Sequence, residues 1–367
     1  YMKKLIFILM MPLVVKAQYG FNATSTNDKL DAVSRSYIVE MSGQDFWYVF
    51  RQDKYTTKAP DFDIDNVLAL ATDLKAVGKE LKIIYTLEPR NVMSISDNFY
   101  GFEKLKPYVK AIRIGNECFF KEAGFNKDWD TYINSNQSLI TEAKTKNLPI
   151  LFSWADPSWI DWNTKAANYI NSNTLFYPDL HLYWSSKEAP ILNTLVDKKL
   201  PSEKITGYSV TKDNFYSSLY TQITTSTFLN EIIENMRVLM PNKNIYVTEF
   251  GAPVGVGEIG NTFGTEAVND WLINQCKNIP EIVALCKFNL GSVTGVITDA
   301  SKNDFVTGKV KRTGYYSMQM SIKYKDATPF QFTGEGQFNF SVHNLTSETL
   351  NLTLPQGYYF ESFSYEC

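Results

Sequence analysis

Short strand-like segments alternate with helical patterns over most of this 367-residue sequence. Six runs rich in branched and aromatic side chains predict strands that begin near residues 81, 111, 148, 179, 244 and 282. The segments between most of these runs carry apolar side chains at helical spacing. Strands separated by helices pair in parallel, so the alternation predicts an α/β fold built around a parallel sheet.

The spacing of these strands narrows the choice of sheet. Most successive strand starts lie 30 to 38 residues apart, the size of one strand–helix unit in an eight-stranded barrel of ~250 residues. An open, doubly wound sheet has similar spacing. A complete barrel also needs two more strands before Leu81. Residues 36–41 and 46–50 are β-rich, but four residues between them cannot hold a parallel crossover. Either a barrel is irregular at its start, or one of these runs is not a barrel strand.

Both ends of the sequence differ from this pattern. A basic start, an apolar run at residues 5–15 and Ala17 match the layout of a secretory signal peptide. We therefore expect residues 1–17 to be removed and the protein to be secreted, periplasmic or at the cell surface, the alternative being a buried first strand or helix. Residues 326–367 alternate with period two and predict antiparallel strands that pack on the rest of the fold. We expect no membrane span.

Charge and composition exclude several function classes. The formal net charge of −3 implies no basic surface, so we expect no nucleic-acid partner. The sequence contains only two histidines, His181 and His343, and no Cys/His spacing, so we expect no metal site. Cys276 and Cys286 are close enough in sequence to pair, but free buried thiols are an equally good interpretation, and Cys118 and Cys367 have no obvious partners.

Two of the predicted strands end in a carboxylate. Glu117 follows the run at 110–116, and Glu249 lies in the run at 244–251. In a parallel barrel every strand ends on the same face, which carries the active site, so the two side chains would converge there. Two carboxylates in one cleft are the minimum for glycoside hydrolysis, one as a proton donor and one as an ionised group. The alternative is a pair of ordinary strand-end charges.

These motifs resemble a known group of enzymes. Gly-Asn-Glu at 115–117 and Thr-Glu-Phe-Gly at 248–251, three strands later, resemble the retaining glycoside hydrolases of the (β/α)8-barrel clan A, without indicating a family within it. The resemblance covers roughly residues 81–288. It implies a TIM barrel, which the residue pattern places over residues 18–325 with an irregular first quarter, and the same pattern predicts residues 326–367 as a small C-terminal β extension. It also implies Glu117 as the acid/base, Glu249 as the nucleophile and Asn116 as a ligand of the sugar 2-hydroxyl.

Other residues extend the predicted site. His181 and Tyr183 share one side of their strand, and clan members often carry a His or aromatic residue there and a Tyr that hydrogen-bonds the nucleophile. Sugar rings stack on aromatic side chains, and the candidates for such stacking are Trp154, Trp159 and Trp184. The alternative for tryptophans in this region is core packing, which is favoured for Trp162.

The sequence departs from the clan pattern at two places. Many members carry a Trp at the end of the eighth strand, where this chain has Lys287, Phe288 or Asn289, and we expect Asn289 to bind substrate. The Arg that many members keep at the end of the second strand is not identifiable, and Arg51 is a guess. Arg113 either supports a carboxylate by its charge or stabilises the barrel interior.

The prediction is therefore a retaining glycoside hydrolase that cleaves β-glycosidic bonds of an oligo- or polysaccharide, without cofactor or metal, as a monomer or weak oligomer. The alternative is a barrel that binds carbohydrate without cleaving it. A Gly-x-Gly-x-x-Gly sequence at 255–260 matches a dinucleotide-binding pattern. It follows the seventh strand at too great a distance for such a turn, so we interpret it as a loop beside Glu249.

Overall fold

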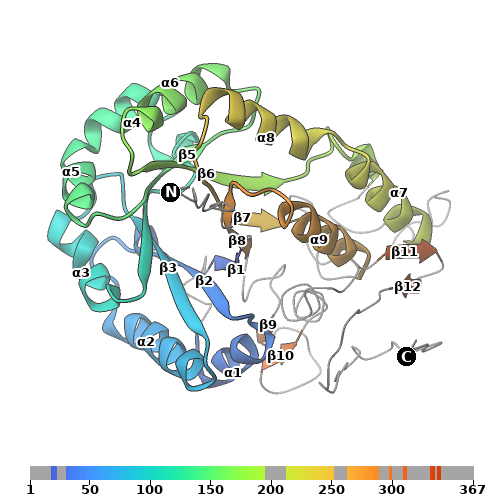
Figure 1. Ribbon diagram of the computed structural model, residues 1–367, viewed down its shortest axis with the longest axis horizontal. Helices are drawn as coiled ribbons and strands as arrows, with labels where there is room; N and C mark the ends of the chain where they lie inside the picture. Colours follow the sequence, from blue (N-terminus) through green and yellow to red (C-terminus); the bar gives the residue numbers. More distant parts are fainter. Residues whose placement is uncertain are drawn as a thin grey trace, which may run out of the picture.

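The protein is a closed barrel of eight parallel strands (Figure 1). The computed structural model describes residues 18–22, 30–194, 212–251, 263–288, 297–299, 309–311, 331–334 and 337–339. β1 pairs with both β2 and β8, which closes the sheet and excludes the open, doubly wound alternative. The expected (β/α)8 fold is thus confirmed. The strands are β1 (Gln18–Asn22), β2 (Asp45–Arg51), β3 (Glu80–Leu87), β4 (Val109–Ile114), β5 (Ile150–Trp154), β6 (Phe176–Tyr183), β7 (Ile245–Gly251) and β8 (Ile282–Phe288).

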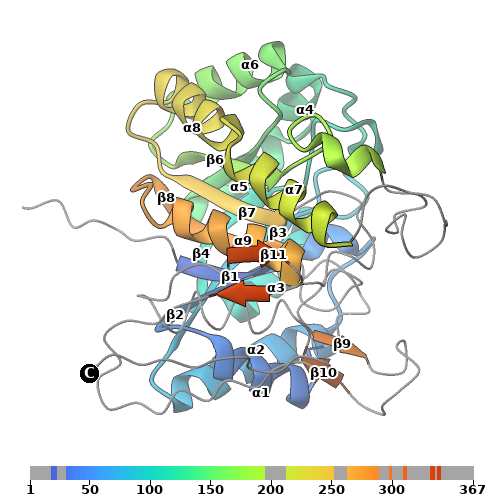
Figure 2. The ribbon, with the colours of Figure 1, turned by 90° about the vertical axis from the view of Figure 1, so that its right-hand side faces the viewer.

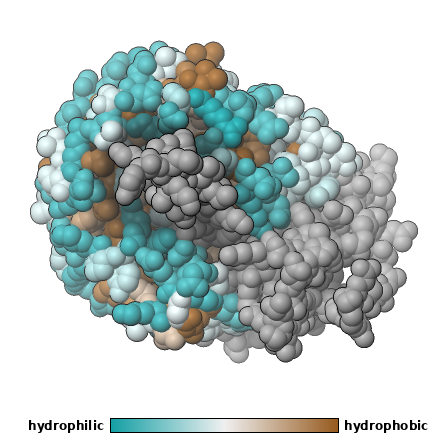
Figure 3. All heavy atoms as spheres, in the orientation of Figure 1, coloured by the Kyte–Doolittle hydropathy of each residue, from teal (hydrophilic) through white to brown (hydrophobic). Residues whose placement is uncertain are grey.

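Helices surround the barrel and bury their apolar faces against it (Figure 1). The outer surface is mostly hydrophilic in the same view (Figure 3), as expected for amphipathic helices around a core. The helices are α1 (Ala32–Met41), α2 (Asp61–Ala76), α3 (Ile95–Leu105), α4 (Trp129–Ser135), α5 (Gln137–Thr145), α6 (Ile160–Asn171), α7 (Lys212–Thr224), α8 (Phe228–Leu239) and α9 (Phe263–Cys276).

The first quarter of the chain contains a complete strand–helix–strand unit. β1 begins at Gln18 and pairs in parallel with β2, and α1 lies between them. Residues 36–41 lie in α1, so this run is not a barrel strand, which confirms the second of our two alternatives. The irregular start that we also expected is not observed, because β1, α1 and β2 form a regular unit. The Tyr, Ile and Val residues of this run favour strands by propensity, but the Asp31 side chain accepts a hydrogen bond from the Ser34 amide and caps a helix here. Helix context therefore overrides the local preference.

The barrel interior changes from apolar to polar toward the carboxyl ends of the strands. The apolar part, here called the lower layer, includes Trp47, Val49, Ile84, Ala111, Leu151 and Tyr246. A Cβ on Gly20 would lie 1.8 Å from the carbonyl oxygen of Trp47, so only glycine fits at this point of β1. Because side chains two residues apart share a face of a strand, the next interior positions toward the strand ends are Arg51, Thr86, Arg113, Ser153 and Thr248. The upper layer is therefore polar.

Several predictions concern segments that the structure describes only in part or not at all. The expected signal peptide and most of residues 326–367 lie outside the described residues, so the proposed domain boundaries stay predictions. Two antiparallel pairs are described, β9 (Ile297–Asp299) with β10 (Lys309–Lys311) and β11 (Gln331–Gly334) with β12 (Gln337–Asn339). β11 lies beside α7 and α9 (Figure 2).

Two further findings concern the thiols and the membrane. Cys118, Cys276 and Cys286 are free and buried, so pairing of Cys276 with Cys286 is excluded in favour of the alternative, free thiols. Cys367 lies outside the described residues. Within the part of the chain that the structure describes, no helix is long and apolar enough to cross a membrane.

Candidate active site

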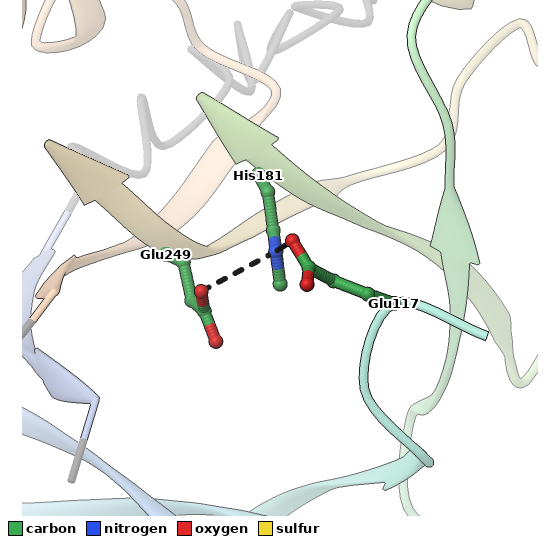
Figure 4. A group of neighbouring side chains, drawn as sticks. All are labelled: Glu117, His181 and Glu249. Atoms are coloured by element: carbon green, nitrogen blue, oxygen red, sulfur yellow. Dashed lines mark hydrogen bonds and ion pairs between the residues drawn. The ribbon is translucent and has the colours of Figure 1, made fainter. Parts of the chain in front are cut away.

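The two predicted carboxylates meet at the carboxyl ends of the barrel strands. Glu117 follows β4, Glu249 lies in β7, and His181 of β6 lies between them (Figure 4). His181 Nδ1 is 3.0 Å from Glu117 Oε1 and 3.5 Å from Glu249 Oε2. One oxygen of each carboxylate and this nitrogen all lie within 4.8 Å of one another. The convergence expected from the strand count is therefore present.

A tight turn after β4 directs Glu117 toward the barrel axis. Gly115 has φ +75°, and a Cβ there would lie 2.4 Å from Pro89 and 2.5 Å from the Cys118 sulfur. Glu117 itself has φ +45°, a left-handed conformation that a non-glycine residue rarely adopts. Such strain persists where the surrounding structure holds it, most often at functional sites.

A β-bulge in β7 brings two successive side chains to the site. Leu180 pairs with Val247 but His181 pairs with Glu249, so Thr248 is an extra residue opposite β6. Thr248 Oγ1 lies 3.2 Å from His181 Nε2, while the Glu249 carboxylate accepts a hydrogen bond from Tyr183. Regular alternation would send one of the two outward. A bulge re-aims side chains in this way at barrel rims.

Glu249 is buried and held by three donors. Its Oε1 accepts hydrogen bonds from Asn22 Nδ2 at 2.8 Å and Arg51 Nη1 at 3.3 Å, and its Oε2 accepts one from the Tyr183 hydroxyl at 3.1 Å. Arg51 is itself fixed by a two-pronged ion pair with Asp53, at 2.7 and 2.6 Å. These contacts fix the orientation of the Glu249 carboxylate and compensate its burial.

Glu117 and His181 form a coupled pair in which each favours the charged form of the other. Burial favours the protonated form of Glu117, but the hydrogen bond and charge of His181, with the charges of Arg51 and Arg113, lower its pKa below the ordinary value. Burial likewise favours a neutral His181, but Glu249, Glu117 and Asp179 together raise the pKa of its ring. Protons on the two groups are therefore interdependent.

A buried ionic group lies directly beneath His181. Arg113 is fully buried and donates to Thr86 Oγ1 at 2.9 Å, Thr248 Oγ1 at 2.6 Å and Asp179 Oδ2 at 3.4 Å. Its Nη1 is also 3.3 Å from His181 Nε2. The Thr248 hydroxyl donates a short hydrogen bond to Asp179 Oδ1. These hydrogen-bonded groups come from four strands of the barrel, β3, β4, β6 and β7.

Solved structures share this barrel fold at low sequence identity. The sequence matches no protein-family model and no curated protein. A family 51 alpha-L-arabinofuranosidase from Bifidobacterium longum matches with TM-score 0.51 and 9% identity, covering 84% of this chain and 72% of that one. A GH5_18 protein from Streptomyces cattleya, in complex with GlcNAc, matches with TM-score 0.51 and 10% identity, covering 84% and 80%. A GH5_18 protein from Bifidobacterium longum subsp. infantis gives 0.50 and 12%, covering 84% and 79%.

The chain shares its fold with glycoside hydrolases. At 9 to 12% identity this similarity establishes the barrel and no more. Roles for the residues therefore depend on the geometry of this chain, in which the strand count places Glu117 after β4 and Glu249 in β7.

Glu117, His181 and Glu249 also offer ligand atoms at spacings that a metal ion could bridge. The surrounding groups favour protons over a metal ion at this position. Both oxygens of Glu249 already accept hydrogen bonds, and the guanidinium groups of Arg51 and Arg113 lie 3.3 Å from Glu249 and His181. A metal ion placed there would be repelled by both guanidinium groups.

The other predicted site residues differ in what the structure describes of them. Asn116 is half-buried beside Glu117, and its Oδ1 has no hydrogen-bond partner among the described residues. Tyr183 makes the contact with Glu249 that we expected for it. Asn289 lies outside the described residues. The roles of all three in binding a sugar stay predictions.

The three tryptophans occupy different environments. Trp184 is fully buried and packs against Phe228 of α8 and Trp271 of α9. Trp154 at the end of β5 is also buried. Both positions correspond to core packing, the alternative to sugar stacking. Trp159 is half-buried, its ring nearly perpendicular to those of Phe119 and Phe120 and the Lys127 ammonium 4.1 Å from its ring centre, so stacking on a sugar stays a prediction there.

Sequence reasoning missed or left open several residues that line the site. Arg51 ends β2 and contacts Glu249, as our guess placed it. Asn22 gave no signal, because its strand directly follows the expected signal peptide and is only five residues long. Arg113 was identified, but its contacts with Asp179 and Thr248 depend on the register between distant strands, which no local pattern specifies.

Proposed function

We propose that the protein is a retaining glycoside hydrolase that cleaves β-glycosidic bonds of an oligo- or polysaccharide. Glu249 is the nucleophile and Glu117 the acid/base. The shared barrel fold and the position of the two carboxylates at the ends of β4 and β7 support this assignment. The observation that carries it is the unequal environment of the two groups.

The environments of the two carboxylates suit different tasks. The Glu249 side chain is 5% exposed and receives three hydrogen bonds, as a nucleophile held in one orientation requires. The Glu117 side chain is 32% exposed and contacts His181. A group that delivers a proton to a departing sugar and then activates water needs such access to the cleft.

The separation of the carboxylates supports retention of configuration. Retaining enzymes place the two groups ~5–5.5 Å apart, whereas inverting enzymes need ~6.5–9.5 Å to admit a water molecule between carboxylate and sugar. Here one oxygen of Glu117 and one of Glu249 lie within 4.8 Å of each other. These two oxygens lie closer together than the inverting range, which supports direct attack by Glu249 over attack by a water molecule.

Double displacement follows from these assignments. A Glu249 oxygen attacks the anomeric carbon while the bond to the leaving oxygen breaks and Glu117 transfers its proton to that oxygen. Glu117, now ionised, removes a proton from water, and the resulting hydroxide attacks the anomeric carbon. The bond to Glu249 breaks, and both carboxyl groups return to their initial protonation states. Asn22, Arg51 and Tyr183 orient Glu249 throughout.

Activity is tested by incubation with a panel of β-linked polysaccharides and oligosaccharides. The panel includes GlcNAc-containing oligosaccharides and, as one α-linked member, an α-L-arabinofuranoside, because one matching structure holds GlcNAc and another is an α-L-arabinofuranosidase. We expect wild type to release reducing sugar, and Glu249→Gln to lose at least about 10³-fold in kcat. If neither protein releases sugar but both bind it, the chain is a carbohydrate-binding barrel.

Retention is tested by following the configuration of the first-formed product by NMR. A retaining enzyme releases the β-anomer from a β-linked substrate before mutarotation. Azide added to Glu117→Ala should also give a β-glycosyl azide, because the small anion replaces water without needing a base. An α-anomer as the first product would assign an inverting mechanism instead.

We also propose that the protein is exported after removal of residues 1–17 and works as a monomer or weak oligomer. The layout of those residues supports export. Intact mass of the protein recovered outside the cytoplasm, after expression of the full chain, tests the cleavage. Sedimentation tests the oligomeric state.

A further inference from the structure

Arg113 occupies a position that the proposed reaction does not require. TIM-barrel interiors are filled mainly by branched apolar side chains, yet this guanidinium is fully buried under the carboxylate pair. Its Nη2 has no hydrogen-bond partner among the described residues. A buried cation with an unsatisfied donor destabilises a fold. The other terminal nitrogen of Arg113, Nη1, lies 3.3 Å from His181 Nε2, and this contact suggests a function that offsets the energetic cost.

The hydrogen-bonding capacities of these groups determine where the proton of a neutral His181 lies. His181 Nδ1 faces carboxylate oxygens of Glu117 and Glu249, which accept hydrogen bonds when ionised. His181 Nε2 faces Arg113 Nη1, which can only donate. The Thr248 hydroxyl, 3.2 Å from Nε2, donates to Asp179 and accepts from Arg113, so Arg113 is the one donor that faces Nε2 among the described residues. A neutral ring therefore satisfies its neighbours best with the proton on Nδ1.

The charges around His181 oppose one another. Glu117 after β4, Asp179 on β6 and Glu249 on β7 favour a positive ring, with Nδ1 or Nε2 within 3.8 Å of each carboxylate. Arg113 from β4 opposes it from 3.3 Å. Arg51 of β2 lies beyond Glu249 and also opposes it. Of the two cations, only Arg113 lies within hydrogen-bond distance of the ring.

We infer that Arg113 is a positioning residue for His181: its Nη1 keeps Nε2 an acceptor, and its charge restrains the ring from taking up a second proton. The consequence for catalysis rests on the proposed function. A general acid must hold a proton, and a positive His181 would draw that proton off Glu117. By opposing a positive charge on His181, Arg113 opposes transfer of the shared proton from Glu117 to the ring, so that Glu117 can deliver it to the leaving oxygen.

Histidine NMR tests this directly, because the chain has only two histidines, His181 and His343. In ¹⁵N-histidine-labelled full-length protein, His343→Gln identifies the His181 signals. Above the titration midpoint, we expect Nδ1 protonated and Nε2 unprotonated. In Arg113→Met the midpoint should rise by about one pH unit or more, the effect of a unit charge 3.3 Å away even at the dielectric constant of water. Arg113→Lys should lie between Met and wild type.

Arg237→Met is the matched control, since Arg237 pairs with Glu281 on the outside of the barrel. Its His181 midpoint should equal that of wild type. A proton on Nε2 in neutral wild-type His181 would overturn the inference. This measurement needs no variant at position 113, so the inference can be tested even if Arg113→Met does not fold. An unchanged midpoint in a folded Arg113→Met overturns it as well.

Kinetics separate this inference from the proposed function. With an active substrate, Arg113→Met should lower kcat with little change in KM and move the alkaline limb of the pH profile upward. A purely structural role would lower activity without moving that limb. If wild type cleaves no sugar, the proposed function fails, while the NMR titration still decides the role of Arg113.

Discussion

Removal of the Tyr183 hydroxyl tests how the site holds its nucleophile. The hydroxyl donates to Glu249 Oε2 at 3.1 Å, while Asn22 and Arg51 bind the other oxygen. Tyr183→Phe leaves the ring and those two contacts in place. The carboxylate then loses its hydroxyl donor on Oε2 and can rotate away from the anomeric carbon.

The size of the effect follows from the charge and burial of the acceptor. A hydrogen bond to a charged group contributes about 1.5–3 kcal/mol, and the Glu249 side chain is only 5% exposed, so water replaces the lost donor poorly. If this energy is expressed in the transition state, kcat/KM falls about 10- to 150-fold. Loss of orientation should appear mainly in kcat.

Initial rates on the polysaccharide that wild type cleaves best measure the change. Tyr177→Phe is the control, because Tyr177 lies on the same strand at the opposite end, where its ring meets Tyr246. That variant should stay within about twofold of wild type. Equal kcat/KM in Tyr183→Phe and Tyr177→Phe would refute the assignment of Tyr183 as an orienting donor.

Three further predictions concern stability and accessibility. The pKa of folded His181 is raised, so its contribution to stability is complete below about pH 6.5 and is lost as pH rises through the folded value. The difference in urea midpoint between wild type and His181→Gln should shrink from pH 6 to pH 9, and a constant difference contradicts this. Gly20→Ala should destabilise the barrel by about 3 kcal/mol or more in urea unfolding, because its Cβ would overlap Trp47. The control Gly78→Asn should leave the free energy of unfolding nearly unchanged, because Gly78 has φ +75° and open space around it. A thiol reagent added to native Cys367→Ser should leave three buried thiols unmodified until denaturant is added, namely Cys118, Cys276 and Cys286.

The alternation of strand and helix patterns predicted the six strands from the third onward, and the resemblance to clan A, not the alternation, favoured a closed barrel over an open sheet. Parallel strands buried on both faces read as short apolar runs, and turns and helices separate them clearly. Once the strands were counted, the common face of their carboxyl ends brought Glu117 and Glu249 together without knowledge of side-chain contacts. The order of elements therefore predicts the centre of the site well.

The rest of the site depends on features that local patterns do not contain. β1 has five residues, too few for a clear period, and α1 has branched side chains that resemble a strand. The bulge at Thr248 changes which side chains face inward, and a regular alternation would have placed Thr248 and Glu249 on opposite faces. Tryptophans near strand ends are ambiguous in sequence, because such a ring can pack on helices, as Trp184 does on Phe228 and Trp271, or on a sugar.

The polar layer explains why the carboxylates, cations and His181 act as a unit. Arg51 and Arg113 are each buried with a carboxylate partner, Asp53 and Asp179 respectively. Removal of one member of a buried pair leaves an uncompensated charge, which costs more than the pair contributes. Each pair also reaches the reacting groups, Arg51 through Glu249 and Arg113 through His181. The buried charges that destabilise the barrel interior therefore have two uses: Arg51 orients Glu249, and Arg113 opposes a second proton on His181.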